Sequence, residues 1–233
     1  MDMKLLIAMC LVARAAMVSA DPPIPCCAPK QMTFIYGEVV TTQTGDVPMA
    51  IARQALEGAI DFTDAVTGYY VNQDPVNGTE VKFRLVQNFT AGFQWLIEGS
   101  HCLKMSLTNV SPPVQCIPDS AIYQGSFAFG LEKLKVNAWR IDSSRAGVFQ
   151  GTQDYTSTDY MCIPFSSTVI GQDFTTSYPT TLVSSGGYTN VTTTISDPDR
   201  WFKLPSSCNN SMEGNGVTFR RLHQRPWFPW PSF

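Results

Sequence analysis

Apolar and polar residues alternate with a period of two along much of the chain. In Val81–Leu85 the odd positions are apolar and the even ones charged, and Phe93–Ile97 repeats the pattern. The alternation returns at Lys133–Ala138, with Trp139 and Ile141 on the opposite face. This pattern is typical of strands with one face on a core and the other in water. We therefore predict a mainly β fold of antiparallel sheets, packed face to face or forming a partly closed barrel.

Turn signals separate these segments, and the stretch from Pro48 to Ile60 has a helical rather than a strand pattern. Pro48 could open a short helix that runs to Ile60 through Ala50, Ile51, Ala55 and Leu56, and this is the one helix that the sequence predicts. Turns are expected where Gly, Pro, Asn and Asp gather: Gly45-Asp46, Asn77-Gly78, Pro112-Pro113, Gly186-Gly187 and Asp197-Pro198.

The two ends of the chain depart from the strand pattern. Lys4 precedes an apolar run, and Val18-Ser19-Ala20 resembles a cleavage site, so residues 1–20 are expected to be a secretory signal peptide. A membrane anchor is the alternative, but Arg14 interrupts the run well short of the roughly 20 apolar residues that span a bilayer. No later segment is a transmembrane candidate. Residues 21–208 form the expected domain, and 209–233 an extended tail of alternating prolines and aromatics.

Composition and cysteine use agree with secretion. The net charge of −3 offers no basic patch for nucleic acid. Cys10 leaves with the signal peptide, and the remaining cysteines suggest three disulfides among about 15 possible pairings. Zinc is a weak alternative, because only the adjacent Cys26 and Cys27 are close in sequence. Five Asn-x-Ser/Thr sequons mark expected glycan sites: Asn77, Asn88, Asn109, Asn190 and Asn209.

Catalytic groups are scarce. His101 adjoins a cysteine and His223 lies in the tail, so neither favours a nucleophile–histidine pair. Metalloprotease, phosphate-loop and nucleophile-elbow motifs are not found in the sequence. A pair of carboxylates could still hydrolyse a glycoside, since spatial spacing is invisible in sequence. We expect neither an enzyme nor an organic cofactor.

Four short motifs occur in an order that resembles the ependymin-related family. They are Cys26-Cys27-Ala28-Pro29-Lys30-Gln31, Cys102-Leu103-Lys104-Met105-Ser106-Leu107, Asp159-Tyr160-Met161-Cys162-Ile163-Pro164, and the closing run from Asp197-Pro198 through Phe202 and Pro205 to Cys208. Each motif alone is unspecific, but the four in order cover the chain from Cys26 to Cys208.

The resemblance implies a fold like that of bacterial lipoprotein carriers, with curved antiparallel sheets around an apolar pocket. It implies a secreted glycoprotein that binds calcium, a hydrophobic or lipid-like small molecule and extracellular matrix, and that forms a homodimer. It also implies the disulfides Cys26–Cys162 and Cys102–Cys208, which leaves Cys27 to pair with Cys116. The family's remaining bridge has no counterpart in this chain. Conversely, the aromatic C-terminal tail of this chain is not part of the family pattern.

Candidate site residues follow from these expectations. The pocket is expected to be lined by apolar strand faces, although for each member taken alone plain core packing is the better explanation: Phe83, Leu85, Phe93, Trp95, Ile97, Leu134 and Val136. Calcium needs six to eight oxygens, and the carboxylates near turns are Asp61, Asp64, Asp197 and Asp199, for which turn formation is the simpler explanation.

The sequence thus predicts an extracellular protein that binds an apolar ligand in a β-lined pocket. The alternative is a structural matrix glycoprotein with no pocket in use, whose glycans and calcium make its contacts. An enzyme is the third hypothesis.

Overall fold

The computed structural model describes residues 22–76, 78–107, 111–130, 133–144, 147–174, 178–210 and 212–213. Nearly all regular structure in these ranges is β-strand. The elements are β1 (Gln31–Thr44), β2 (Ala50–Asp61), β3 (Val66–Pro75), β4 (Val81–Asn88), β5 (Phe93–Glu98), β6 (His101–Ser106), β7 (Ile122–Phe129), β8 (Leu134–Asp142), β9 (Phe149–Thr158), β10 (Pro164–Asp173), β11 (Thr180–Thr192), helix α2 (Pro198–Phe202), the 3-10 helix η1 (Ser206–Asn210) and β12 (Met212–Glu213).

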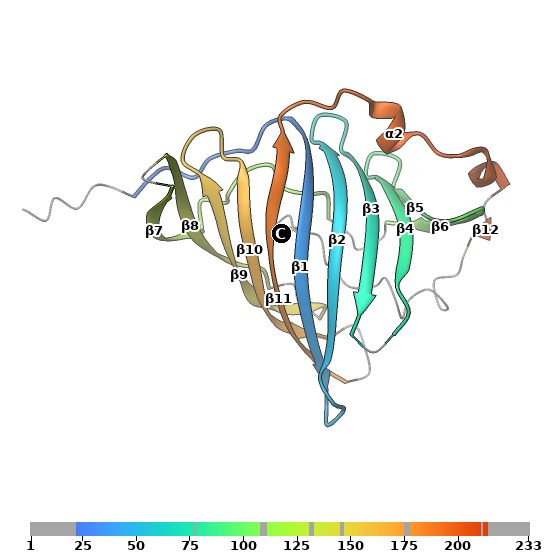
Figure 1. Ribbon diagram of the computed structural model, residues 1–233, viewed down its shortest axis with the longest axis horizontal. Coiled ribbons are helices and arrows are strands. Elements are labelled where there is room, and N and C mark those ends of the chain that lie inside the picture. Colours follow the sequence, from blue (N-terminus) through green and yellow to red (C-terminus); the bar gives the residue numbers. More distant parts are fainter. Residues whose placement is uncertain are drawn as a thin grey trace, which may run out of the picture.

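The described strands form one twelve-stranded sheet in the order β12-β6-β5-β4-β3-β2-β1-β11-β10-β9-β8-β7 (Figure 1). Strands β1 to β11 pair antiparallel, whereas β12 pairs in parallel with β6. Hairpins lead outward from the central β1–β11 pair on both sides, as expected when consecutive strands are neighbours. The predicted mainly antiparallel β fold is confirmed, and its strands make a single open sheet.

The alternation of residues divides the sheet into two faces. Along β1 every even-numbered residue from Met32 to Thr42 is buried, whereas the odd-numbered Ile35 and Val39 are exposed. Cross-strand pairs continue the buried face on other strands: Tyr36 is paired with Tyr188, and Tyr155 with Trp139. We call the side of Tyr36 the inner face and the side of Val39 the outer face.

The inner face carries three apolar clusters rather than one. The largest lies mainly on β1 to β3 and β11, the second mainly on β8 and β9, and the third on β1, β9 and β11. Their buried members are Ala28, Met32, Phe34, Tyr36, Leu56, Ile60, Tyr69, Val71 and Tyr188; Ile117, Trp139, Ile141, Tyr155 and Cys162; and Val40, Phe149 and Leu182. A domain usually has one contiguous core. Polar side chains lie between these clusters, as described below.

The C-terminal strap, residues 195–208, lies on the outer face over β2 to β4. Trp201 is buried with Ala59, and Cys208 with Val86. The Arg84 guanidinium fixes the strap by donating to the carbonyls of Trp201 and Lys203, both at 2.9 Å. Figure 1 shows α2 beside the ends of β2 and β3. The disulfide between Cys102 and Cys208 then attaches the strap to β6.

Three local predictions were wrong. The stretch from Pro48 to Ile60, predicted as a helix, contains most of β2, because Leu56 and Ile60 alternate onto the inner face opposite Tyr36 and Met32. Asp197-Pro198 begins α2, with the Asp197 carboxylate accepting from the Arg200 amide at 3.1 Å and Pro198 near the helix start. Gly186-Gly187 lies inside β11 rather than in a turn.

Candidate functional site

Glu38 is a buried carboxyl group in the middle of the inner face. The strand places it between Tyr36 and Val40, and 7% of its surface is exposed. Its Oε2 atom accepts hydrogen bonds from the Ser184 hydroxyl and, at 3.5 Å, from the Tyr36 hydroxyl. Its Oε1 atom is buried and has no hydrogen-bond partner among the described residues. Burial raises the pKa of this carboxyl to about 7, against an ordinary value of 4.5.

Other polar groups continue from Glu38 across the inner face. Ser184 is on β11, Ser167 on β10 and Gln153 on β9, and all three are buried. The Gln153 side-chain amide donates to the Ser167 hydroxyl at 2.8 Å. Buried polar residues at inward positions of four neighbouring strands are unusual for a plain core, which is built mainly from apolar side chains. We call Glu38, Ser184, Ser167 and Gln153 the inner polar row.

Four buried tyrosines lie on the same inner face, on β1, β3, β9 and β11. Burial raises the pKa values of the Tyr36, Tyr69 and Tyr155 hydroxyls above the range in which they would ionise. The pKa of Tyr188 is raised first by burial and then by its neighbours, which include the other three tyrosines and Glu38. All four hydroxyls are therefore neutral at physiological pH.

Glycines allow aromatic rings to lie against the inner face. A Cβ atom on Gly186 would lie 2.5 Å from the Cζ and hydroxyl atoms of Tyr36, so the Tyr36 ring covers this glycine. A Cβ on Gly58 would lie 2.7 Å from Phe34. The Tyr36 and Tyr188 ring centroids are 4.7 Å apart, and Phe34 and Tyr188 are 5.4 Å apart. The result is an aromatic surface with hydroxyl and carboxyl groups at its centre.

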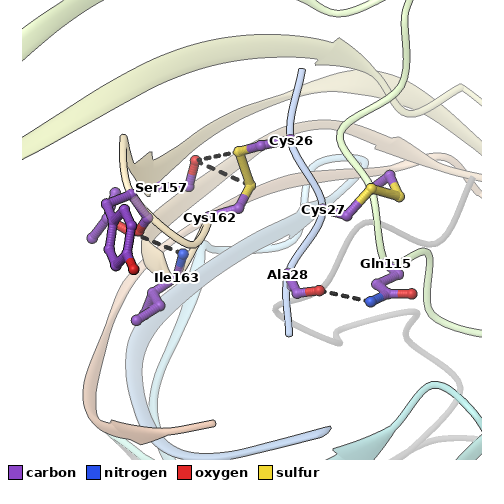
Figure 2. The surroundings of a disulfide bond; sticks show 10 residues. Cys26, Cys27, Ala28, Gln115, Ser157, Cys162 and Ile163 are labelled. Carbon is purple, nitrogen blue, oxygen red and sulfur yellow. Dashed lines mark hydrogen bonds between the residues drawn. A yellow bond between two sulfur atoms is a disulfide. The ribbon is translucent and has the colours of Figure 1, made fainter. Parts of the chain in front are cut away.

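Two segments, 22–30 and 111–121, cover part of the inner face and are joined by disulfides. Cys27 bonds Cys116, and the Gln115 side chain donates to the Ala28 carbonyl at 2.7 Å (Figure 2). Cys26 bonds Cys162 beside Ser157 (Figure 2). Ala28 packs in the first inner cluster and Ile117 in the second. These three disulfides are the pairs that the sequence led us to expect.

The pocket residues suggested by the sequence do not share one face. Phe83 and Leu85 pack against the first inner cluster. Trp95 and Ile97 pack with Cys208 on the outer side, beneath the strap. Phe93, paired with Asn88, is half-buried beside Lys104, whose ammonium lies 3.8 Å from the ring centroid.

The last two of these residues lie at the far edge of the sheet. Val136 pairs with Phe127 and Leu134 with Phe129, on the outer face of β8. Val136 is buried, whereas Leu134 is exposed. The inner polar row was missed at the sequence level. Glu38 could have been found, because it has the same parity along β1 as Phe34, Tyr36 and Val40.

Three of the four candidate calcium ligands, Asp61, Asp197 and Asp199, make structural contacts through their carboxylates, whereas Asp64 contributes its backbone amide. The buried Asp61 accepts from the Gln31 amide at 2.5 Å and from the backbone amides of Thr63 and Asp64. Asp197 caps α2, and Asp199 pairs with Lys203 at 2.8 Å. Across the part of the chain that the structure describes, no three His, Cys, Asp or Glu side chains gather to hold a metal ion.

The remaining expectations are placed as follows. Asn88, Asn190 and Asn209 lie in described regions, and the last two are exposed. His101 is exposed at the start of β6. Asn77, Asn109, His223, the signal peptide and residues 214–233 lie outside the described residues. No helix within the described ranges is both long and apolar enough to cross a bilayer.

The sequence model of the Ependymin family matches residues 77–208, which include β4 to β11, the strap and four of the six bridged cysteines. The chain belongs to the Ependymin family. The chain is 27% identical over 183 residues to the development-specific protein LVN1.2 of Lytechinus variegatus, an alignment that covers 75% of this chain and 96% of that protein. The suspected family resemblance is thus confirmed, and this ependymin-family chain has its three disulfides in the described domain.

Among solved structures, this chain matches the LolA superfamily protein NE2245 from Nitrosomonas europaea. The match covers 86% of this chain and 96% of that one, at 9% identity and a TM-score of 0.29.

Proposed function

We propose that this ependymin-family chain is a secreted protein that binds an apolar molecule against the inner face of its sheet. The observation that carries the proposal is the inner polar row within an aromatic surface. Ligand sites are mostly apolar surfaces with a few placed polar groups that fix orientation. Glu38, Ser184 and the four tyrosines supply such groups among Phe34, Val40 and Leu182.

Covalent closure supports the same proposal. The segments 22–30 and 111–121 are fixed by Cys26–Cys162 and Cys27–Cys116, so the cover of the inner face is tied to the sheet. Three disulfides also fit an oxidising, extracellular compartment. A tied cover keeps a binding surface in place without using the ligand to order it, which lowers the cost of binding.

Matched substitutions on neighbouring residues of β1 test the proposal. The neutral probe N-phenyl-1-naphthylamine is titrated into wild type, Val40→Thr and Val39→Thr. Both changes keep the side-chain shape, but only Val40 is on the inner face. A buried hydroxyl without a compensating bond costs about 1–3 kcal/mol, so we expect Val40→Thr to weaken binding about tenfold and Val39→Thr to leave it unchanged. Failure of the folded wild type to bind this probe would refute the proposal.

The second candidate is a matrix glycoprotein whose exposed glycans make its contacts, with calcium bound by their acidic sugars. The observation that favours it is the exposure of Asn190 and Asn209 on the described surface. Calcium binding that is lost on enzymatic deglycosylation, in a protein that binds no apolar probe, would support this candidate. Homodimer formation and matrix binding stay predictions under either function.

A further inference from the structure

The Oε1 atom of Glu38 is a hydrogen-bonding group that the described residues leave unused. Its partner oxygen, Oε2, accepts from Ser184 and Tyr36, whereas Oε1 is buried with no partner. A buried polar atom left unpaired has lost its hydrogen bonds to water without replacement, which is unfavourable and more so if the atom is charged. Such an atom calls for an explanation, and a bound ligand group is one.

The surroundings of Glu38 narrow the chemistry of that ligand. The neighbouring groups are the hydroxyls of Ser184 and Tyr36, the Tyr188 side chain, whose pKa Glu38 helps to raise, and Val40, the next inward residue of β1. None of these neighbours is a cation that would offset a second carboxylate. A ligand ammonium could pair with the ionised carboxyl, but both charges would have to be desolvated, and in a buried site that penalty can exceed their mutual attraction. A neutral hydroxyl is much less costly to bury and can donate to a carboxylate oxygen.

We propose that the Glu38 carboxyl binds the hydroxyl group of a neutral, long-chain apolar ligand, with Oε1 as the acceptor. This rests on the proposed function and adds the ligand class and the residue that selects it. Ser184 and Tyr36 hold Oε2, so the carboxyl plane is fixed and Oε1 is left for the ligand. The apolar part of the ligand then lies along the aromatic side chains of the inner face.

The test compares ligands that share a formula but differ in one donor. 1-Dodecanol and its isomer methyl undecyl ether compete against N-phenyl-1-naphthylamine at pH 8.5, with dodecylamine and dodecanoate as further arms. At that pH the carboxyl, with a pKa of about 7, is ionised and can only accept. One hydrogen bond to a charged group contributes about 1.5–3 kcal/mol, so the alcohol should bind at least tenfold better than the ether.

Two variants locate the preference. Glu38→Gln is isosteric and places an amide donor where either ligand oxygen can accept, and Glu38→Met removes the hydrogen bond altogether. Both should bring the alcohol-to-ether ratio close to one while the apolar probe still binds. Glu98→Gln, an exposed change on β5, is the control and should keep the wild-type ratio.

The outcomes separate this inference from the proposed function. Equal binding of alcohol and ether by wild type, an unchanged ratio in Glu38→Gln, or tighter binding of the amine or the carboxylate would overturn the role of Glu38 and leave apolar binding intact. Failure of wild type to bind the probe or any of the four ligands would overturn the function and the anchor together.

Discussion

Ser184 donates a hydrogen bond to the Oε2 atom of Glu38, and this contact joins β11 to β1 across a separation of 146 residues. The two hydrogen-bonded polar side chains lie on the buried face of the two central strands. Because Oε2 accepts this hydrogen bond, Oε1 is the carboxyl oxygen that has no partner among the described residues. The central β1–β11 pair is therefore both the structural middle of the sheet and the place where its unusual chemistry lies.

Glu38 should make folding stability depend on pH. In the unfolded chain this carboxyl ionises near its ordinary value of 4.5, whereas in the folded protein its pKa is about 7. Between these values the folded state retains a proton that the unfolded state has lost, so stability falls as pH rises from about 4.5 to 7 and then levels off. Urea unfolding should show a loss of roughly 3 kcal/mol between pH 4.5 and 8 from this group.

The variant Glu38→Gln isolates that contribution. It should lack this pH-dependent loss, whereas the exposed Glu98→Gln should behave as wild type does. A Glu38→Gln protein whose stability varies with pH as steeply as that of wild type would show that Glu38 is not the responsible group.

Gly186 and its neighbour Gly187 offer a matched pair for packing on the two faces. A methyl group on Gly186 would lie 2.5 Å from Tyr36 and 2.6 Å from the Gly37 carbonyl, whereas on Gly187 its nearest contact is 3.6 Å. Overpacking typically costs about 1–3 kcal/mol, so Gly186→Ala should destabilise by that amount. Gly187→Ala should be neutral or slightly stabilising, because glycine is unfavourable in a strand. Equal free energies of unfolding for the two variants would contradict this packing.

Arg84 should hold the C-terminal strap in place. Arg84→Ala removes the two hydrogen bonds to the Trp201 and Lys203 carbonyls, and we expect a loss of about 2–3 kcal/mol. Hydrogen exchange of the amides in residues 198–208 should accelerate in this variant. Lys82→Ala, on the same face of β4 with an exposed ion pair to Glu80, should change stability by less than about 1 kcal/mol. Unaltered exchange in the strap of Arg84→Ala would rule out this role.

Non-reducing peptide mapping should recover Cys26–Cys162, Cys27–Cys116 and Cys102–Cys208. The paired change Cys27→Ser/Cys116→Ser opens a bridge that spans 89 residues and should cost about 2–5 kcal/mol. Its effect on hydrogen exchange should be largest in residues 111–121, since segment 22–30 stays attached through Cys26. A peptide that links Cys26 to Cys27 would contradict the pairing.

The sequence predicted much of the sheet because strand alternation is a local signal. Val81–Leu85, Phe93–Ile97 and Leu134–Ile141 lie within β4, β5 and β8. The helix prediction failed at β2 because Ala50, Ile51, Ala55 and Leu56 also fit a helical period. Only pairing with β1 and β3 decides between the two, and pairing partners are not visible in a single segment.

The candidate site was harder to predict than the fold. A charged residue in an alternating segment usually marks the solvent side, so charge alone does not predict that Glu38 shares the buried face of Tyr36 and Val40. Gly186-Gly187 suggested a turn because the ring that covers Gly186 comes from Tyr36, far away in the sequence. Alternation shows that a strand has an apolar side but not which face of the sheet that side joins. Phe83 and Trp95 therefore look alike in the sequence, although Phe83 is on the inner face and Trp95 on the outer face.

The most direct test of the central claim is native mass spectrometry of the protein purified from its natural source, with the disulfides intact. The account predicts a mass excess over the polypeptide and any glycans attached to it. Organic solvent should release this excess as a neutral, hydroxyl-bearing apolar compound, and the stripped protein should take the compound up again. A mass explained fully by polypeptide and glycans, together with no uptake of any apolar compound, would contradict it.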